Sequence, residues 1–350
     1  MSILPPLVDP DALAAYLAVQ IPGGGEPLQI ERIRGGHSNE TFFVTRGVQQ
    51  WVLRRPPRGP LLPTAHDVGR EYRVLAALSQ TSVPVPRPLL FCEDIGVLGA
   101  PFYLMERVRG YVIRTELPPF AVEDAEARAA LGRALVDRLA DLHAVDWQAV
   151  GLEDFGKPSG YLERQIRRWT GQLDASRNRP LPDLDRVTAW LQAHVPESGP
   201  ATIVHGDYRL DNVMYARDLP VRIAAIFDWE MATLGDPLAD LGYLLSFWRE
   251  PGDPHFAMMD AAWRVTEAPG FPTRAALVAR YAERTGRRMD AVSFYVALAI
   301  WKLAILLEGS YKRHLAGTTD DPFFATLDEG IPALARRALA VCDGEITFTL

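Results

Sequence analysis

Residues 204–212, with the sequence VHGDYRLDN, decide how this chain is interpreted. They place Asn212 five residues after Asp207, and Asp228 follows sixteen residues after the asparagine. Asp228 ends the apolar run 223–227, which is typical of a buried strand. A lone Asp and Asn at this spacing occur by chance, but a second acid directly after a predicted strand makes the pattern specific.

Two acids and one amide in this order suit the transfer of a phosphoryl group. In protein kinases a catalytic-loop Asp accepts the hydroxyl proton, while an Asn five residues later and a further Asp hold magnesium. By this pattern Asp207 is the predicted catalytic base. Asn212 and Asp228 are the predicted metal ligands, because magnesium prefers oxygen. The alternative is that Asp207 and Asp211 cap turns and Asp228 only ends a strand.

The motif continues as GDPLADLG at residues 235–242, and this passage resembles the aminoglycoside phosphotransferase and choline kinase superfamily. Within it, the chain is similar to the kinase-like domain fused to some acyl-CoA dehydrogenases, from about Ile30 to about Gly317. Eukaryotic protein kinases fit less well, because Gly206 replaces the Arg of their HRD motif and DWE at 228–230 replaces DFG. The resemblance implies a two-lobed, protein-kinase-like α+β fold. It also implies ATP as phosphoryl donor, with GTP possible, and Mg²⁺ as cofactor.

Composition restricts the partners and the compartment. The net charge of −7 argues against binding to nucleic acid or to an anionic membrane surface. Only Cys92 and Cys342 occur, which is compatible with a reducing cytoplasm, and residues 1–10 lack the basic start of a secretory signal. The most apolar segment, residues 291–307, contains Lys302 and predicts a buried helix rather than a membrane span. The oligomeric state stays open.

Hydrophobic spacing divides the chain into a β-rich part, residues 1–109, and a mainly helical part, residues 110–350. The predicted strands of the first part are residues 28–33, 41–45, 50–54, 85–91 and 102–108, and its helices are residues 10–19 and 65–78. The predicted helices of the second part are residues 122–145, 161–174, 184–194, 238–247, 274–285, 291–315 and 322–341.

A glycine-containing hairpin between the first two strands is a candidate phosphate loop. Gly35 and Gly36 allow close backbone approach, and Ser38 and Asn39 can donate hydrogen bonds to phosphate oxygens. An ordinary hairpin turn is the alternative.

The third strand departs from the kinase pattern, which places a Lys there opposite a helix Glu. Strand alternation puts Arg54 in the lysine-like position, with Leu53 on the opposite face. The resemblance implies that Arg54 binds the nucleotide phosphates and pairs with Glu71 of the following helix. For Glu71 the alternative is a solvated helix residue.

Other positions receive supporting roles from the resemblance. Residues 103–108 resemble the segment that joins the two lobes, so backbone groups of Glu106 and Val108 would face the adenine ring. His205 and Asp240 are expected to support the catalytic loop rather than to react.

The acceptor is predicted from an insertion at about residues 146–200, which in related enzymes lines the acceptor pocket. Arg164, Arg167 and Arg168 fall on related faces of its helix and suit an anionic acceptor, such as a carboxylate or a CoA phosphate. The alternative is a solvated basic face paired with Glu163.

The leading hypothesis is therefore an ATP- and magnesium-dependent kinase that phosphorylates a hydroxylated acyl or acyl-CoA-like compound. An aminoglycoside or another hydroxylated metabolite is the second candidate acceptor. A nucleotide-binding pseudokinase with a regulatory role is the rival from another class, and Arg54 in place of Lys is the feature in its favour. An acyl-CoA dehydrogenase is a third reading, but the kinase-like pattern fills most of the chain.

Overall fold

The computed structural model describes residues 6–21, 23, 26–33, 39–58, 66–254, 264–317 and 321–348. It divides into two compact units, Met1–Gly110 with Ala224–Ala232, and Tyr111–Ile223 with Thr233–Leu350. The sequence placed residues 224–232, and Asp228 with them, in the large helical part. The structure groups them with the first unit instead, where Ile226 donates its N–H to the carbonyl of Pro84 at 2.8 Å and Asp228 pairs with Arg54.

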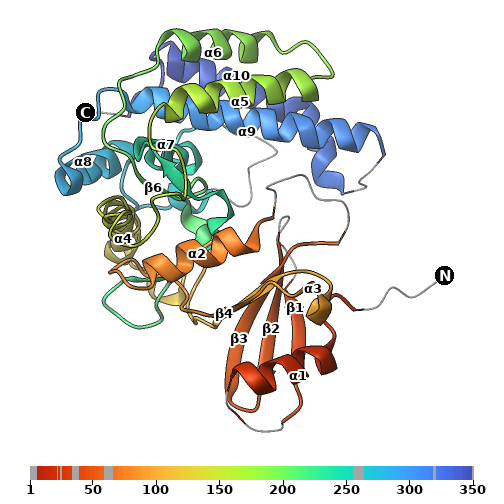
Figure 1. Ribbon diagram of the computed structural model, residues 1–350. Coiled ribbons are helices and arrows are strands. Elements are labelled where there is room, and N and C mark those ends of the chain that lie inside the picture. Colours follow the sequence, from red (N-terminus) through yellow and green to blue (C-terminus); the bar gives the residue numbers. More distant parts are fainter. Residues whose placement is uncertain are drawn as a thin grey trace. The chain divides into compact units, whose positions relative to one another are not determined.

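An antiparallel sheet of five strands, in the order β1-β2-β3-β5-β4, is the frame of the first unit (Figure 1). Its strands are β1 Gln29–Ile33, β2 Glu40–Arg46, β3 Gln49–Arg55, β4 Pro88–Cys92 and β5 Phe102–Glu106. Its helices are α1 Pro10–Gln20, α2 Val68–Leu78 and α3 Ile95–Leu98. Each predicted strand occurs. β4 begins three residues later than predicted, at Pro88, since Pro86 lacks the N–H that a ladder requires, whereas a proline is tolerated as the first residue of a strand.

Alternation along β3 gives the two faces of the sheet different neighbours. Leu53 pairs with Leu104 on β5, and both join the apolar core that Leu13 of α1 covers. Arg54 pairs with Tyr103 and lies on the opposite face, where α2 packs against β4 and β5. The sheet thus presents one buried guanidinium toward α2.

Helices dominate the second unit. They are α4 Ala125–His143, α5 Tyr161–Ser176, α6 Pro182–Ala193, α7 Leu238–Phe247, α8 Arg274–Thr285, α9 Val292–Leu315 and α10 Leu327–Cys342. The short strands are β6 Thr202–Val204, β7 Val213–Tyr215, β9 Thr233–Gly235 and, at the junction of the units, β8 Ile223–Ile226. The predicted helix 322–341 starts as a 3₁₀ turn, Pro322–Thr326, before α10 begins. The predicted α+β class, with a small sheet followed by a helical part, is confirmed.

Helix α9 is the central element of the second unit. It packs against α5, α6, α7 and α10, and Figure 1 shows α5, α6, α9 and α10 as neighbouring helices. By length and mean hydropathy it could cross a membrane, but 67% of its most apolar window is buried inside the protein. Its apolar sequence is therefore accounted for by its place in the core.

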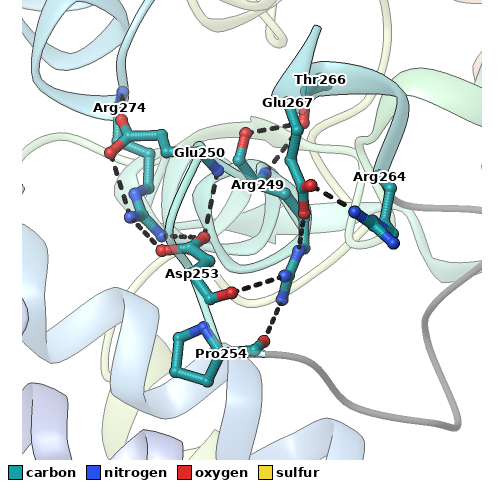
Figure 2. A network of polar contacts seen from close by, with 8 residues as sticks. All are labelled: Arg249, Glu250, Asp253, Pro254, Arg264, Thr266, Glu267 and Arg274. Carbon is teal, nitrogen blue, oxygen red and sulfur yellow. Dashed lines mark hydrogen bonds and ion pairs between the residues drawn. The ribbon is translucent and has the colours of Figure 1, made fainter.

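A network of charged groups fixes the chain after α7, as Figure 2 shows. Arg249, which is only 2% exposed, donates from Nε to Glu267 at 2.9 Å and from Nη1 to the carbonyl of Pro254 at 2.8 Å. Arg274 at the start of α8 donates to Asp253 at 2.8 Å. The backbone N–H of Arg249 also donates to Thr266 at 2.9 Å. These bonds hold residues 248–250 and 264–267 in one arrangement.

Candidate functional site

The loop that carries Asp207 follows β6, which pairs antiparallel with β9. Gly206 has φ +85°, a conformation that favours glycine and explains why the usual kinase Arg is absent. His205 is fully buried, and its Nδ1 accepts the backbone N–H of Asp207 at 3.2 Å. A 3₁₀ turn, Leu210–Asn212, then leads into β7. Short strands on both sides thus hold the loop.

Asp240, on the first turn of α7, is buried and binds the backbone of this loop. Its Oδ2 accepts the N–H of His205 at 2.6 Å, and its Oδ1 accepts the N–H of Gly206 at 2.8 Å. His143 on α4 contacts the same carboxylate at 3.2 Å through Nε2, while its Nδ1 meets the hydroxyl of Tyr281 at 2.7 Å. Burial lowers the pKa of His143 and so favours the neutral ring. His205 and Asp240, the two residues expected to support the loop, thus both bind its backbone.

The Asp207 carboxylate is held in place yet remains accessible, with 21% of its side chain exposed. Asn212 donates from Nδ2 to Asp207 Oδ2 at 2.7 Å and to the Asp207 carbonyl at 2.8 Å. Tyr243 lies close to this carboxylate, and burial together with the negative charge of Asp207 raises the pKa of Tyr243 well above its usual value. The carboxylate is therefore oriented and can receive a proton.

Arg209 is a contact of Asp207 that the sequence analysis missed. Its Nε lies 3.2 Å from Asp207 Oδ1, and its Nη1 lies 3.1 Å from Asp211 Oδ2. The guanidinium also stacks over Phe247, 5.0 Å from the ring centroid. A cation two residues after the base and two before another acid was the signal available in the sequence. Arg209 brings positive charge directly to the Asp207 carboxylate.

A buried ion pair forms the charged centre of the first unit. Arg54 Nη1 donates to Glu71 Oε1 at 2.6 Å, with side-chain exposures of only 9% and 1%. Its Nη2 donates to Asp228 Oδ1 at 3.2 Å. Burial opposes the charge of Arg54, but Glu71, Tyr103 and Asp228 together outweigh this effect and raise the pKa of the guanidinium. Glu71 is thus the buried partner of Arg54 and not a solvated helix residue. A role in phosphate binding stays a prediction.

The two predicted metal ligands each keep an oxygen that suits magnesium. Both hydrogen bonds of the Asn212 amide leave from its nitrogen, so the carbonyl oxygen remains as an acceptor. Asp228 binds Arg54 through Oδ1, and 30% of its side chain is exposed. Its φ of +63° is uncommon for a residue other than glycine, and such backbone outliers concentrate at functional sites. Within the described ranges no three His, Cys, Asp or Glu side chains converge on a metal position. A metal ion held by either residue would need further oxygen ligands, such as those of a nucleotide.

The other predicted nucleotide contacts are only partly described. Gly35, Gly36 and Ser38 lie outside the described residues. Asn39 is buried, and its amide donates to Glu71 at 3.4 Å rather than facing outward.

The segment predicted to face adenine begins at the end of β5. The N–H of Glu106 donates to the carbonyl of Arg87 at 2.9 Å, so this donor is already used, while Val108 lies beyond the strand. Contact of either residue with adenine stays a prediction.

The three arginines of α5 diverge, although the sequence grouped them. Arg164 turns back to the carbonyls of Lys157 and Ser159 and so fixes the start of its own helix. Arg167 is exposed beside a groove between α5 and the end of α6. Arg168, also exposed, lies 5.8 Å from the ring of Trp169. Arg167 and Arg168 are adjacent and point about 100° apart, whereas Arg164, about one turn earlier, is held by carbonyls of the loop before the helix. None of them is a buried contact.

Two hollows in the second unit adjoin the Asp207 loop. One is mostly apolar and lies beside Arg209. Its lining residues include Ile113, Leu210, Leu244, Phe247, Trp248 and Val265. The charged network of Figure 2 holds the Trp248 and Val265 side of this wall. The other hollow lies between α5, α7 and α9 and includes Tyr243, the second group that contacts Asp207. An acceptor at Asp207 thus has an apolar and a polar neighbour.

Comparison with known proteins gives one family. The model of the phosphotransferase enzyme family matches residues 29–277. Acyl-CoA dehydrogenase family member 11 of Rattus norvegicus is 37% identical over 343 residues, which cover 94% of this chain and 43% of that protein. The chain therefore spans less than half the length of this curated relative.

Solved structures agree with the fold. A Ralstonia eutropha protein described as a candidate aminoglycoside phosphotransferase is 35% identical, with a TM-score of 0.82 over 96% of this chain and 98% of that chain. The aminoglycoside phosphotransferase APH(4)-Ia, solved as a variant with AMP-PNP and hygromycin B, is 14% identical, with a TM-score of 0.61 over 94% and 98% of the two chains. The second likeness concerns the fold alone.

Proposed function

The chain belongs to the phosphotransferase enzyme family, and from this premise we propose the nucleotide, the metal and the acceptor that it uses. Its reaction class is phosphoryl transfer to an alcohol group of a small molecule. The proposed donor is ATP, with GTP as the alternative, and the proposed metal is Mg²⁺. Support for ATP comes from the AMP-PNP bound to a phosphotransferase of similar fold.

The observation that carries the proposal is the fixed Asp207 carboxylate, which Asn212 orients at 2.7 Å. In the proposed reaction Asp207 accepts the proton of the acceptor hydroxyl, whose oxygen forms a bond to the γ-phosphorus while the bond to the ADP oxygen breaks. Asn212 and Asp228 would supply protein oxygens to Mg²⁺, which neutralises phosphate charge. Arg54, held by Glu71, would contact the phosphates.

The proposed acceptor is a hydroxylated acyl compound, free or as its CoA thioester. The apolar hollow beside Arg209 suits an alkyl chain next to the base. The name of the rat relative points to acyl-CoA chemistry, although that name describes a protein more than twice as long. The proposal for this chain therefore depends on the apolar wall near Asp207.

An aminoglycoside is the second candidate, favoured by the description of the Ralstonia eutropha protein. A polycation requires unengaged acids, and those around the base already have partners. Asp211 pairs with Arg209, and both oxygens of Asp240 accept backbone N–H groups. The charge distribution therefore favours the acyl compound.

The test is acceptor-dependent release of ADP in the presence of Mg²⁺. The panel contains hydroxyacyl-CoAs, the corresponding free hydroxy acids, kanamycin and choline. Acyl-CoAs without a hydroxyl serve as matched inert compounds, and the Asp207→Asn variant is the enzyme control. We expect turnover only with hydroxylated acyl compounds. Efficient phosphorylation of kanamycin with inert hydroxyacyl compounds would contradict the acceptor, and binding of ATP without turnover of any acceptor would favour the pseudokinase.

A further inference from the structure

The hollow between α5, α7 and α9, which adjoins the Asp207 loop, contains a cation that the proposed mechanism does not use. Lys302 extends from α9 into this hollow. The other residues that matter for its character are Tyr161, Gly206, Asp240, Tyr243 and Tyr295. Gly206 directly precedes Asp207, and the negative charge of Asp207 helps to raise the pKa of Tyr243. The hollow thus ends close to the reacting carboxylate, inside the second unit.

Lys302 has no carboxylate within ion-pair distance anywhere in the described part of the chain. Its Nζ lies 5.5 Å from the ring centroid of Trp169, a contact that leaves its three N–H donors without an oxygen acceptor. Asp240 lines the same hollow, but the N–H groups of His205 and Gly206 occupy its oxygens. The Lys302 side chain is only partly buried, so an oxygen acceptor from outside the chain can reach its ammonium group.

We propose that Lys302 binds an acyl oxygen of the acceptor, either the carboxylate of a hydroxy acid or the thioester oxygen of its CoA derivative, and so positions the acceptor hydroxyl at Asp207. This inference rests on the proposed function. It assigns the specificity for acyl compounds to α9, whereas the sequence analysis assigned it to the arginines of α5. The hydroxyl, the alkyl chain and the acyl oxygen would each have a place next to the same carboxylate.

The electrostatics of the hollow make the interaction depend on pH. Burial lowers the pKa of Lys302 to about 8, against the opposing effect of Asp240. Arg168 lowers it further, and Asp207 raises it. Tyr161, Tyr243 and Tyr295 also face the hollow, and burial raises the pKa of each, so they stay neutral while Lys302 titrates. Lys302 is therefore cationic below its pKa and loses its charge as pH rises through about 8.

The first experiment measures turnover with Lys302→Met, which keeps the length of the side chain and removes its charge. Loss of one hydrogen bond to a charged group corresponds to a rise in the acceptor KM of about 10- to 100-fold, with kcat changed much less. Lys302→Arg should restore part of the affinity. The matched control is Lys312→Met, which removes an exposed lysine of the same helix that donates to the carbonyl of Ala175. Its KM should equal that of the wild type.

Two further readouts separate substrate binding from a structural effect. The wild-type KM for a hydroxy acid should rise as pH passes the pKa of Lys302, while the KM of Lys302→Met should stay flat. A neutral alcohol of similar length should show no difference between the two proteins. The proposal would be overturned if Lys302→Met had a KM for hydroxy acids and thioesters within twofold of the wild-type value. It would also be overturned if the KM of this variant for the neutral alcohol rose by the same factor. Parallel runs with the free acid and the thioester show which oxygen is used.

Calorimetry keeps this test independent of turnover. A set of hydroxyoctanoates is titrated into the wild type and into Lys302→Met without nucleotide. If the variant binds about tenfold or more weakly, the result supports the role of Lys302. This holds even if no acceptor is phosphorylated, because a lack of phosphorylation would refute only the proposed function. Equal binding by both proteins, or no binding of either the acids or their thioesters by the wild type, refutes the role of Lys302.

Discussion

Replacement of Asp240 by Asn should cost both stability and catalysis, because no orientation of an amide satisfies the loop above it. In the wild type, Oδ2 accepts the N–H of His205 at 2.6 Å and Oδ1 accepts the N–H of Gly206 at 2.8 Å. An asparagine has one carbonyl oxygen and one NH₂ group. Whichever way the amide lies, its NH₂ faces one of these N–H donors, and the negative charge is lost as well.

The magnitude follows from these contacts. A hydrogen bond to a charged group contributes about 1.5–3 kcal/mol, and a buried donor without a partner costs about 1–3 kcal/mol. Because the two effects overlap, we expect Asp240→Asn to lower the free energy of unfolding by about 2–4 kcal/mol. The loop should also shift, and a displacement near 1 Å of the base lowers kcat by roughly 100-fold.

Asp236→Asn provides the matched control. This buried carboxylate accepts the N–H of Leu238 at 3.0 Å and the hydroxyl of Tyr295 at 2.7 Å. A tyrosine hydroxyl can accept as well as donate, so an amide can keep both bonds. Denaturant unfolding and kcat should therefore change far less in Asp236→Asn than in Asp240→Asn. Equal losses in the two variants, or a wild-type kcat in Asp240→Asn, would refute the bracing role.

Three further predictions test other parts of the site. Asp228→Ala should abolish Mg²⁺-dependent ATP binding, and Asn212→Ala should weaken it. Calorimetry with and without the metal measures both effects, and an unchanged metal dependence in Asp228→Ala would place the ion elsewhere. Arg54→Lys should bind ATP better than Arg54→Ala. Glu71→Ala leaves the buried Arg54 without this partner and should lower the free energy of unfolding by about 3–5 kcal/mol. If these variants bound ATP and unfolded like the wild type, the ion pair would have no role in either property. Arg249→Ala should destabilise the second unit by a similar amount in denaturant unfolding, and a loss below about 1 kcal/mol would show that the network of Figure 2 is not a structural support.

Local patterns predicted the elements that position the site. The alternation of β3 placed Arg54 opposite to Leu53, and the apolar spacing of α7 gave its bounds, Leu238–Phe247, without error. These features depend on neighbouring residues, whose periodicity is visible in the sequence. The fold class and the family could be predicted for the same reason, since the motif around Asp207 is local.

Contacts between distant residues could not be predicted in the same way. The grouping of residues 224–232 with the first unit reflects contacts to distant residues, such as the bond from Ile226 to Pro84, 142 positions earlier in the chain. Arg209 had acids on both sides, and only the folded loop shows that it contacts both Asp207 and Asp211. In the sequence Lys302 was only a charged residue within an apolar segment, and the folded α9 places it in the hollow beside Gly206.

The most direct test of the central claim is release of ADP that depends on both an acceptor hydroxyl and Asp207. Wild type and Asp207→Asn are compared at saturating MgATP, with hydroxylated acyl compounds and their dehydroxylated counterparts. We expect phosphorylated product only from the hydroxylated compounds. In Asp207→Asn, kcat should be lower by roughly 10²–10⁴-fold, while the affinity for ATP should not change. Product formation by Asp207→Asn at the wild-type rate would contradict the assignment of Asp207 as the base.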